Sequence, residues 1–482
     1  MNTAITYEAV IGLEVHVQLN TKSKIFCPCS TKFGAEPNTN VCPICMGFPG
    51  TLPVLNRGVV EKAVSAGLAL GCRIQNISMF DRKNYFYPDL PKAYQVSQMF
   101  KPICLGGGLC IEKDDGTTKW VNITRIHIEE DAGKLVHGEN IGSADSSYVD
   151  LNRSSIPLIE IVSEPEMTSA EEARLYMQKI RTILLYVDAS DCNMEEGSLR
   201  CDANVSIRPV GQEKLGTRVE IKNMNSFRNV QRAVEYEIKR QERVLREGGS
   251  IRQETRLWDS VQNITQAMRS KENAHDYRYF PEPDLQQVYV SDEYIAELKR
   301  VLPELPDSRK ARFINDYKLP AEDAVLLVSD IHYADYYELA LSFYKNPKLI
   351  ANWLMGEALR VVNDKNIAIS EVMAPEHLAA LVKLVDEGII SGKQGKEVFA
   401  MAVETGKNPA DLVKETGMAQ LSNTDELNTF VQQVIAANPK EAERYQAGET
   451  KLQGFFVGQI MKVSSGKANP QLVNELLRKY LS

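Results

Sequence analysis

Long apolar runs are absent from this sequence, and no stretch approaches the roughly 18 residues that a membrane-spanning helix needs. The first residues hold no basic segment followed by an apolar one, and they lack the arginine- and serine-rich composition of a transit peptide. The chain also shows no internal repeat and no low-complexity stretch. We therefore expect a globular, cytoplasmic protein with no membrane partner.

Three common signatures of nucleotide-binding and metal enzymes are missing as well. The chain has no G-x-x-x-x-G-K-[ST] phosphate loop, no G-x-G-x-x-G after a strand and no H-E-x-x-H. If this chain uses ATP, the nucleotide must therefore bind at a sheet with the help of metal ions.

Length and composition are those of an ordinary globular protein. The 482 residues exceed what one hydrophobic core usually supports, so two or three domains are expected. Hydrophobic residues make up 43% and charged residues 25% of the chain. Because the net charge is -8, any contact with nucleic acid must come from local basic patches.

Four of the nine cysteines lie close together in the sequence. Cys27 and Cys29 form one short pair, and Cys42 and Cys45 form another after a gap of twelve residues. Each pair can bind one side of a tetrahedral ion, so the spacing predicts a structural zinc site, with an iron–sulfur site or free thiols as alternatives. Four thiolates would close the ion's coordination and leave no position for catalysis. The other cysteines are typical of packing residues: Cys72, Cys104, Cys110, Cys192 and Cys201.

Short strands broken by turns dominate residues 7–290, which indicates an α+β fold. One long helix is clear in this part, because Ser226 can cap a segment that continues to Arg246. After Ser291, alanine, leucine, glutamate and lysine dominate, and prolines separate the predicted helices. We expect three domains: a catalytic domain with the cysteine site over 1–293, an all-α domain over 294–406 and a small helical tail over 407–482.

Polar side chains alternate with apolar ones on several predicted strands. Glu14 and His16 share one strand face, while Leu13 and Val15 point to the other. Further polar residues fall on strand faces or at strand ends in the same way: Glu129, Glu130 and Asp131 after RIHI, Asp202, Asn204 and Ser206 after Arg200, and Glu220 with Lys222. A solvated sheet face is the more common cause for one such strand alone. If the faces converge, cations must offset the repulsion between carboxylates, and Mg²⁺ with phosphate oxygens is the natural choice.

The segment DRKNYFYPDLPKAYQVSQ, residues 81–98, mixes cations with aromatic rings. Pro88 and Pro91 prevent a helix here, so we expect a loop. Such a loop can bind anionic or acyl groups through Lys83, Tyr85 and Lys92. Structural packing of the aromatic rings is an equally good interpretation of this segment alone.

Eight long collinear blocks stand out along the chain: GLEVHVQL, CPICMG, DRKNYFYPDLPKAYQ, IHIEEDAGK, NRSSIPLIEIVSEPEM, MEEGSLRCDANVSIRP, VEIKNMNSFRNVQRAVEYEIKRQ and AHDYRYFPEPDL. Together they resemble the B subunit of the Asp/Glu-tRNA amidotransferase family, and the tail from about Gly406 resembles the YqeY-type domain of that family. Two departures are visible. Ala93 stands where the family usually has glycine, and Ser154 with Ser155 replaces a small apolar pair.

The resemblance implies a glutamine synthetase-like catalytic domain and a heterotrimer with an amidase (A) subunit and a small C subunit. It implies ATP-dependent phosphorylation of glutamate or aspartate on misacylated tRNA(Gln) or tRNA(Asn), followed by amidation with ammonia that the A subunit releases from glutamine. Within that chemistry we assign charge stabilisation to Glu14, His16, Glu129, Asp202 and Glu220, of which His16, Glu129 and Glu220 would bind Mg²⁺. Substrate or ATP binding is assigned to Lys83, Tyr85, Lys92, Arg200, Asn204, Ser206 and Lys222.

A tRNA-binding face must be locally cationic in so acidic a chain. The tail supplies one candidate set, for which ordinary solvation of helix surfaces is the alternative: Lys451, Lys462, Lys467, Arg478 and Lys479. Two other function classes fit the same features. One is a zinc-braced RNA-binding adaptor without catalysis, and the other is a metal-dependent hydrolase that needs neither tRNA nor ammonia.

Overall fold

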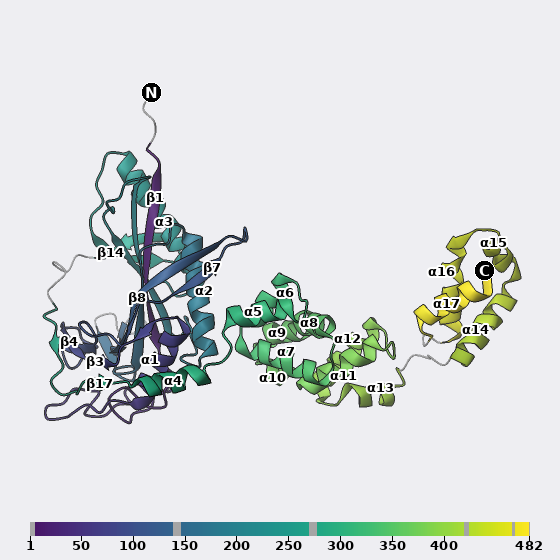
Figure 1. The fold of residues 1–482 in the computed structure, drawn as a ribbon, viewed down its shortest axis with the longest axis horizontal. Coiled ribbons are helices and arrows are strands. Elements are labelled where there is room, and N and C mark those ends of the chain that lie inside the picture. Colours follow the sequence, from purple (N-terminus) through teal and green to yellow (C-terminus); the bar gives the residue numbers. More distant parts are fainter. Residues whose placement is uncertain (1–4, 138–145, 269–276, 419–423, 465–467, 482) are drawn as a thin grey trace. The chain divides into compact units, whose positions relative to one another are not determined.

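The computed structural model describes residues 5–137, 146–268, 277–418, 424–464 and 468–481, and the chain divides into two compact units (Figure 1). The first unit runs from Met1 to Pro306 and the second from Asp307 to Ser482. Helix α4 (Asp292–Val301) therefore belongs with the first unit, because Leu298 packs in its core, whereas the sequence placed the boundary at 293/294. None of the described helices is long and apolar enough to cross a membrane.

A ten-stranded sheet forms the centre of the first unit. Its main path runs in the order β15 (Ile264–Ala267), β14 (Glu254–Asp259), β13 (Val219–Lys222), β12 (Leu199–Pro209), β1 (Tyr7–Gln18), β11 (Pro157–Ser163), β8 (Thr118–Glu130), β6 (Cys104–Leu105) and β2 (Arg73–Ile74). Strand β7 (Gly108–Glu112) pairs with β8 off this path. All these pairings are antiparallel except that of β13 with β14. Strand β1 therefore lies inside the sheet, between strands that come about 150 and 190 residues later in the sequence.

The two faces of this sheet differ in polarity, as the alternation along β1 predicted. Leu13 and Val15 are buried in the apolar core, and Glu14 and His16 point to the other face. Four helices contribute to the same core: α1 (Arg57–Ala69), α2 (Ala170–Tyr186), α3 (Phe227–Arg246) and α4. Figure 1 shows α2 and α3 alongside the long strands. The opposite face of the sheet therefore carries the polar side chains from which a functional site can be built.

Helix α3 begins where the sequence predicted, because the Ser226 side chain accepts a hydrogen bond from the Asn229 amide at 3.2 Å. Its Val230 and Val234 are buried against the sheet. Helices α1 and α2 were not predicted from the sequence. Their polar and apolar residues are less sharply segregated than those of α3, so the pattern that reveals a surface helix is weaker in them.

The segment 81–98 is not simply the loop that the sequence predicted. It forms a hairpin of β4 (Asp81–Asn84) and β5 (Tyr94–Ser97), which β16 (Phe280–Pro281) joins as a third strand. The two prolines lie in the connection between β4 and β5, where they interrupt no strand. Ala93 ends this connection with φ at 62°, in the left-handed region that favours glycine. Two small pairs complete the unit: β9 (Lys134–His137) with β10 (Ser147–Asp150), and β3 (Ile77–Ser78) with β17 (Val288–Tyr289).

The second unit is helical and contains two separate apolar clusters. The first cluster extends from Phe313 to Val413 and uses α5 (Pro306–Asn315), α6 (Ala321–Val328), α7 (Ile331–Phe343), α8 (Pro347–Trp353), the π-helical turn η2 (Leu354–Ala358), α9 (Leu359–Lys365), α10 (Ile369–Val372), α11 (Pro375–Asp386), α12 (Gly392–Thr405) and α13 (Pro409–Thr416). The second extends from Leu427 to Leu481 and uses α14 (Thr424–Ala437), α15 (Pro439–Gln446), α16 (Gln453–Val463) and α17 (Pro470–Leu481), with the short 3₁₀ turn η3 (Thr450–Leu452). Helix α13 thus packs with the preceding helices, although the sequence assigned it to the tail.

Candidate active site and metal centres

Four adjacent strands bring one polar residue each into a line across the sheet. Arg200 on β12 faces His16 on β1. His16 in turn faces Glu160 on β11, and Glu160 faces His127 on β8. Residues directly opposite each other on paired strands project from the same face. All four side chains therefore lie on the polar face of the sheet, opposite the helices.

Two imidazoles on this line contact the same two carboxylates. Nε2 of His16 lies 3.8 Å from Glu129 Oε1 and 3.4 Å from Glu160 Oε2. Nε2 of His127 lies 3.7 Å from Glu129 Oε2 and 3.3 Å from Glu160 Oε2. We call His16, His127, Glu129 and Glu160 the histidine–glutamate cluster.

The charges of this cluster are mutually dependent. Burial lowers the pKa of His127, but Glu160 and Glu129 outweigh that effect and raise it to about 9. The same carboxylates raise the pKa of His16 above its ordinary value against the effect of burial. Although burial acts in the opposite direction, the two imidazoles hold the pKa of Glu160 well below its usual range. Glu160 is therefore anionic, and the two neighbouring imidazoles stabilise its charge.

A second group of acids lies on the same face, on β1, β12 and β13. Glu14, Asp202 and Glu220 each offer a carboxylate oxygen within 4.8 Å of the others, and we call them the triacid cluster. Lys222 binds Asp202 and places its Nζ 3.1 Å from Glu220 Oε1. Asn204 donates a hydrogen bond of 3.0 Å to Glu14 Oε1.

The two clusters are neighbours, because Glu14 of one and His16 of the other lie two residues apart on β1. Burial raises the pKa of Glu14, and the Glu160 carboxylate of the histidine–glutamate cluster raises it further. Lys222 overcomes the effect of burial on Glu220 and lowers its pKa. The carboxylates of the triacid cluster thus differ: burial and Glu160 disfavour the charged form of Glu14, whereas Lys222 favours the charged form of Glu220.

The residues fit divalent cations in two places. His16, Glu129 and Glu160 bring three ligand atoms within 4.8 Å of one another, and the triacid cluster does the same with oxygen alone, the donor that Mg²⁺ prefers. The sequence grouped Glu220 with His16 and Glu129 as Mg²⁺ ligands. In the structure Glu220 belongs to the triacid cluster instead, and Glu160 occupies the third position beside His16 and Glu129. Glu160 and His127 were not predicted from the sequence.

Lys83 lies beside the histidine–glutamate cluster inside a group of tyrosine rings. Its Nζ is 5.0 Å from the ring centre of Tyr277 and 5.8 Å from that of Tyr85. Burial opposes the charged form of this lysine, but Glu129, Tyr279 and Tyr85 raise the pKa of Lys83 above its ordinary value. Tyr277 and Tyr279 were not recognised from the sequence, because they lie almost 200 residues after Lys83 in the chain.

The other residues assigned to substrate binding occupy different environments. Arg200 binds Asp131 at 2.7 Å, and its Nε is buried without a hydrogen-bond partner in the described part of the chain. Lys92 pairs with Glu130, a carboxylate whose side chain is 1% exposed, rather than with the two clusters. Ser206 is buried on β12 opposite Val10.

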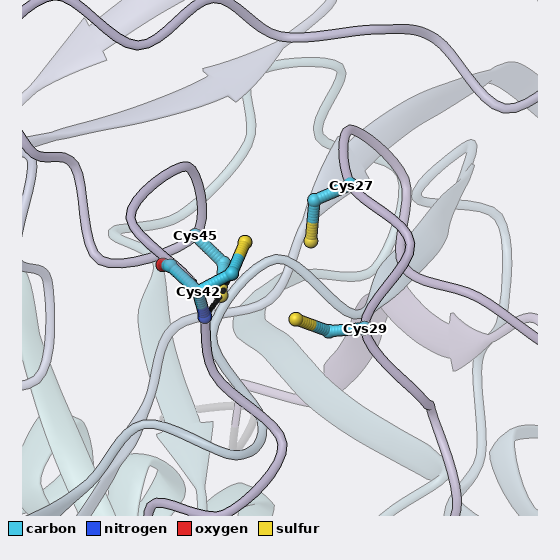
Figure 2. A group of neighbouring side chains, drawn as sticks. All are labelled: Cys27, Cys29, Cys42 and Cys45. Atoms are coloured by element: carbon cyan, nitrogen blue, oxygen red, sulfur yellow. Dashed lines mark hydrogen bonds between the residues drawn. The ribbon is translucent and has the colours of Figure 1, made fainter.

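Two loops bring the four clustered cysteines together, and we call these residues the thiol knuckle. Figure 2 shows Cys27 and Cys29 on one loop facing Cys42 and Cys45 on the other. All four sulfur atoms lie within 4.8 Å of one another, and Sγ of Cys42 is 3.9 Å from Sγ of Cys45. A tetrahedral ion bound at about 2.3 Å requires sulfur atoms about 3.8 Å apart, so the arrangement fits zinc. The hydrogen bond from Cys27, the amide of Cys42 and the nearby Lys24 ammonium lower the pKa of Cys45 to about 4.

The basic residues assigned to tRNA binding are spread over the end of the chain. Lys451 lies in η3, Lys462 at the end of α16, and Arg478 and Lys479 in the last turn of α17, and all four are exposed. Lys467 lies outside the described residues.

The chain combines a sheet that carries two acidic clusters, a thiol knuckle and a helical second unit, and comparison with known families shows which class of protein has this combination. Residues 9–296 match the family model described as the GatB/GatE catalytic domain, and residues 335–481 match the model described as the GatB domain. Two relatives named as the B subunit of aspartyl/glutamyl-tRNA(Asn/Gln) amidotransferase, from Thermoanaerobacter pseudethanolicus and Caldanaerobacter subterraneus, are each 57% identical over 477 residues, and the one from Carboxydothermus hydrogenoformans is 55% identical over 477 residues. Each alignment covers 99% of this chain and 99% of the relative. The chain belongs to this GatB family of tRNA-dependent amidotransferase B subunits.

Proposed function

We propose that this chain activates the side-chain carboxylate of glutamate on tRNA(Gln), of aspartate on tRNA(Asn), or of both, and amidates it with ammonia. The names of the relatives support this substrate class. The observation that carries the chemistry is the pair of acidic clusters that share one sheet face with Arg200 and Lys222, while Lys83 on β4 lies beside them. Such a face can receive an anion that arrives with cations, which is what a triphosphate does.

The activation step is the transfer of the ATP γ-phosphoryl group to the substrate carboxylate. A carboxylate is a poor electrophile, and the acyl phosphate provides a good leaving group that ammonia displaces as phosphate. Mg²⁺ bound by the two clusters would offset the charge of the triphosphate. In this proposal Lys83 and Arg200 would hold the phosphate or carboxylate oxygens. Asn204 and Lys222, which contact the triacid cluster, would fix its orientation.

The partners and cofactors follow from the same proposal. An amidase subunit would supply ammonia from glutamine, a small C subunit would complete a heterotrimer, and ATP with Mg²⁺ would drive the reaction. A zinc ion in the thiol knuckle would be structural, since four thiolates leave no open position. We also propose that the first unit has a glutamine synthetase-like fold, that the tail is YqeY-like, and that its basic residues contact tRNA.

Amide formation in the complete complex tests the proposal. With the nucleophile of the amidase subunit inactivated, ammonium chloride should restore amidation while glutamine should not. Glu129→Gln in this chain should abolish both routes, because Glu129 contacts both His16 and His127. Glu297→Gln, on the exposed side of α4, is the matched control. Ammonium-driven amidation by Glu129→Gln within about threefold of wild type, less than ~1 kcal/mol on the barrier, would contradict the role of this cluster.

A further inference from the structure

Lys24 is a lysine with no exposed surface. It precedes the thiol knuckle in the chain, between β1 and Cys27, and its relative exposure is 0%. Lysine is almost never fully buried without a charged partner, because an ammonium removed from water loses several kcal/mol of solvation. Lys22, two residues earlier, is exposed in the ordinary way. The burial of Lys24 therefore requires a nearby negative charge.

No carboxylate in the described part of the chain forms an ion pair with the Lys24 ammonium. Its Nζ lies 3.6 Å from Sγ of Cys45 and 3.4 Å from the carbonyl oxygen of Leu151. The buried Lys92 differs, because it is paired with the Glu130 carboxylate. A carbonyl oxygen carries only part of a charge, so the sulfur of Cys45 is the one contacted group that can become an anion.

The charge of the thiol knuckle provides the anion that Lys24 lacks. A Zn²⁺ ion with four thiolates carries a net charge of −2, and that charge would also be costly in a site where Cys27 and Cys45 are buried. One ammonium in contact with the site halves the net charge. Cys45 also accepts a hydrogen bond of 3.2 Å from the amide of Cys42, so one sulfur receives both donors.

We propose that Lys24 is the counter-cation of the zinc site. Its ammonium donates a hydrogen bond to the Cys45 thiolate and so helps the site to retain the metal. This inference depends on the proposed zinc occupancy. Lys24 is a positioning residue, and it does not ligate the metal. It also connects the metal loop to Leu151, which precedes the segment where Ser154 donates a 3.0 Å hydrogen bond to the Cys45 carbonyl. Side chains from two parts of the sequence thus converge on this one cysteine.

Zinc content and zinc release in the full-length chain test this role. Protein purified without added metal is analysed for zinc, and release to a chromophoric chelator is timed for wild type, Lys24→Met and the exposed control Lys22→Met. We expect Lys24→Met to release zinc about 10- to 100-fold faster, as is typical when a group that supports a metal ligand is removed. Lys22→Met should release it at the wild-type rate.

A spectroscopic readout separates the charge of Lys24 from its space-filling role. With Co²⁺ in place of zinc, loss of the ammonium should move the sulfur-to-cobalt charge-transfer band to lower energy, because the thiolate becomes more electron-rich. If Lys24→Met does not fold, Lys24→Arg and Lys24→Gln provide the comparison: the charged variant should retain metal better than the neutral one. Release rates within twofold of each other for charged and neutral variants, with an unmoved band, would overturn the proposal. Wild-type protein with less than about a tenth of an equivalent of zinc would instead overturn the zinc site itself.

Discussion

His16 on β1 and Glu160 on β11 face each other directly in the sheet, and their side chains approach to 3.4 Å. Their strands are separated by almost 140 residues of intervening chain. Because side chains alternate between the two faces of a strand, a shift of this pairing by one residue would turn Glu160 into the apolar core. The register of β1 and β11 is therefore a condition for the histidine–glutamate cluster to exist.

Replacing this glutamate tests whether the cluster works as the geometry indicates. We expect Glu160→Gln to lower ammonium-driven amidation by about 10- to 100-fold, because the neutral amide is a weaker metal ligand and loses its attraction to both imidazoles. Glu164→Gln is the control, since Glu164 lies just beyond β11 and accepts a hydrogen bond from Thr124. Activity of Glu160→Gln equal to that of the control would mean that this carboxylate binds no catalytic cation.

The tyrosine rings around Lys83 provide a second prediction. Tyr277→Leu removes the ring 5.0 Å from the ammonium and should reduce amidation by about 2- to 30-fold, the equivalent of roughly 0.5–2 kcal/mol for one cation–π contact. Tyr277→Phe keeps the ring and should remain close to wild type. The measurement is the initial rate at saturating and at limiting ATP. Equal losses in both variants would point to the hydroxyl group and against the ring.

A pH-dependent contribution to stability is expected in the second unit. Burial raises the pKa of Glu338, but Arg312, Arg309 and Tyr317 bind the carboxylate and lower it to about 2. Since the folded pKa lies below the unfolded value of 4.5, the stabilisation is present above pH 4.5 and is lost as the pH falls towards 2. Glu338→Gln should therefore destabilise the unit at pH 7 by roughly 1–2 kcal/mol, a value reduced for the partial exposure of this group.

Thermal unfolding at pH 7 and pH 3 checks this prediction. The difference in melting temperature between wild type and Glu338→Gln should shrink at the lower pH. Glu404→Gln is the control, because Glu404 is exposed near the end of α12. A difference that is the same at both pH values would show that the mutation acts through packing and not through the charge.

Truncation of the tail tests whether it binds tRNA. The structure determines the residue after which the chain should be truncated. A truncation after Gly406 would remove α13, whose Leu412 and Val413 are buried with the preceding helices. A chain that ends at Met418 avoids this damage. It should show a higher KM for aminoacyl-tRNA and a shallower dependence of tRNA affinity on salt, because each lost phosphate contact reduces the slope by about 0.7–0.9. Unchanged affinity and slope would show that the tail does not bind tRNA.

Local patterns in the sequence were sufficient to predict part of the site. Glu14 and His16 alternate with Leu13 and Val15, and this period of two places them on a polar face without knowledge of the partner strands. The thiol knuckle could be predicted for the same reason, because the spacing of its cysteines is local. Glu160 could not be predicted, because it is a single acid in a largely apolar strand and its partners come from β1 and β8. Which carboxylates share an ion depends on strand order, and strand order is a property of the whole sheet.

The order of the strands also determines when the site can form during synthesis. Glu14 emerges from the ribosome early, but its neighbour across the sheet is Asp202, and the third acid of the triacid cluster is Glu220. Strand β1 must therefore wait until translation has passed residue 163 for its neighbour β11, and until residue 209 for its neighbour β12. Leu13 and Val15, which are buried in the folded unit, lack these neighbouring strands during that interval. Residues 7–18 therefore complete their strand pairing on both sides only after translation has passed residue 209.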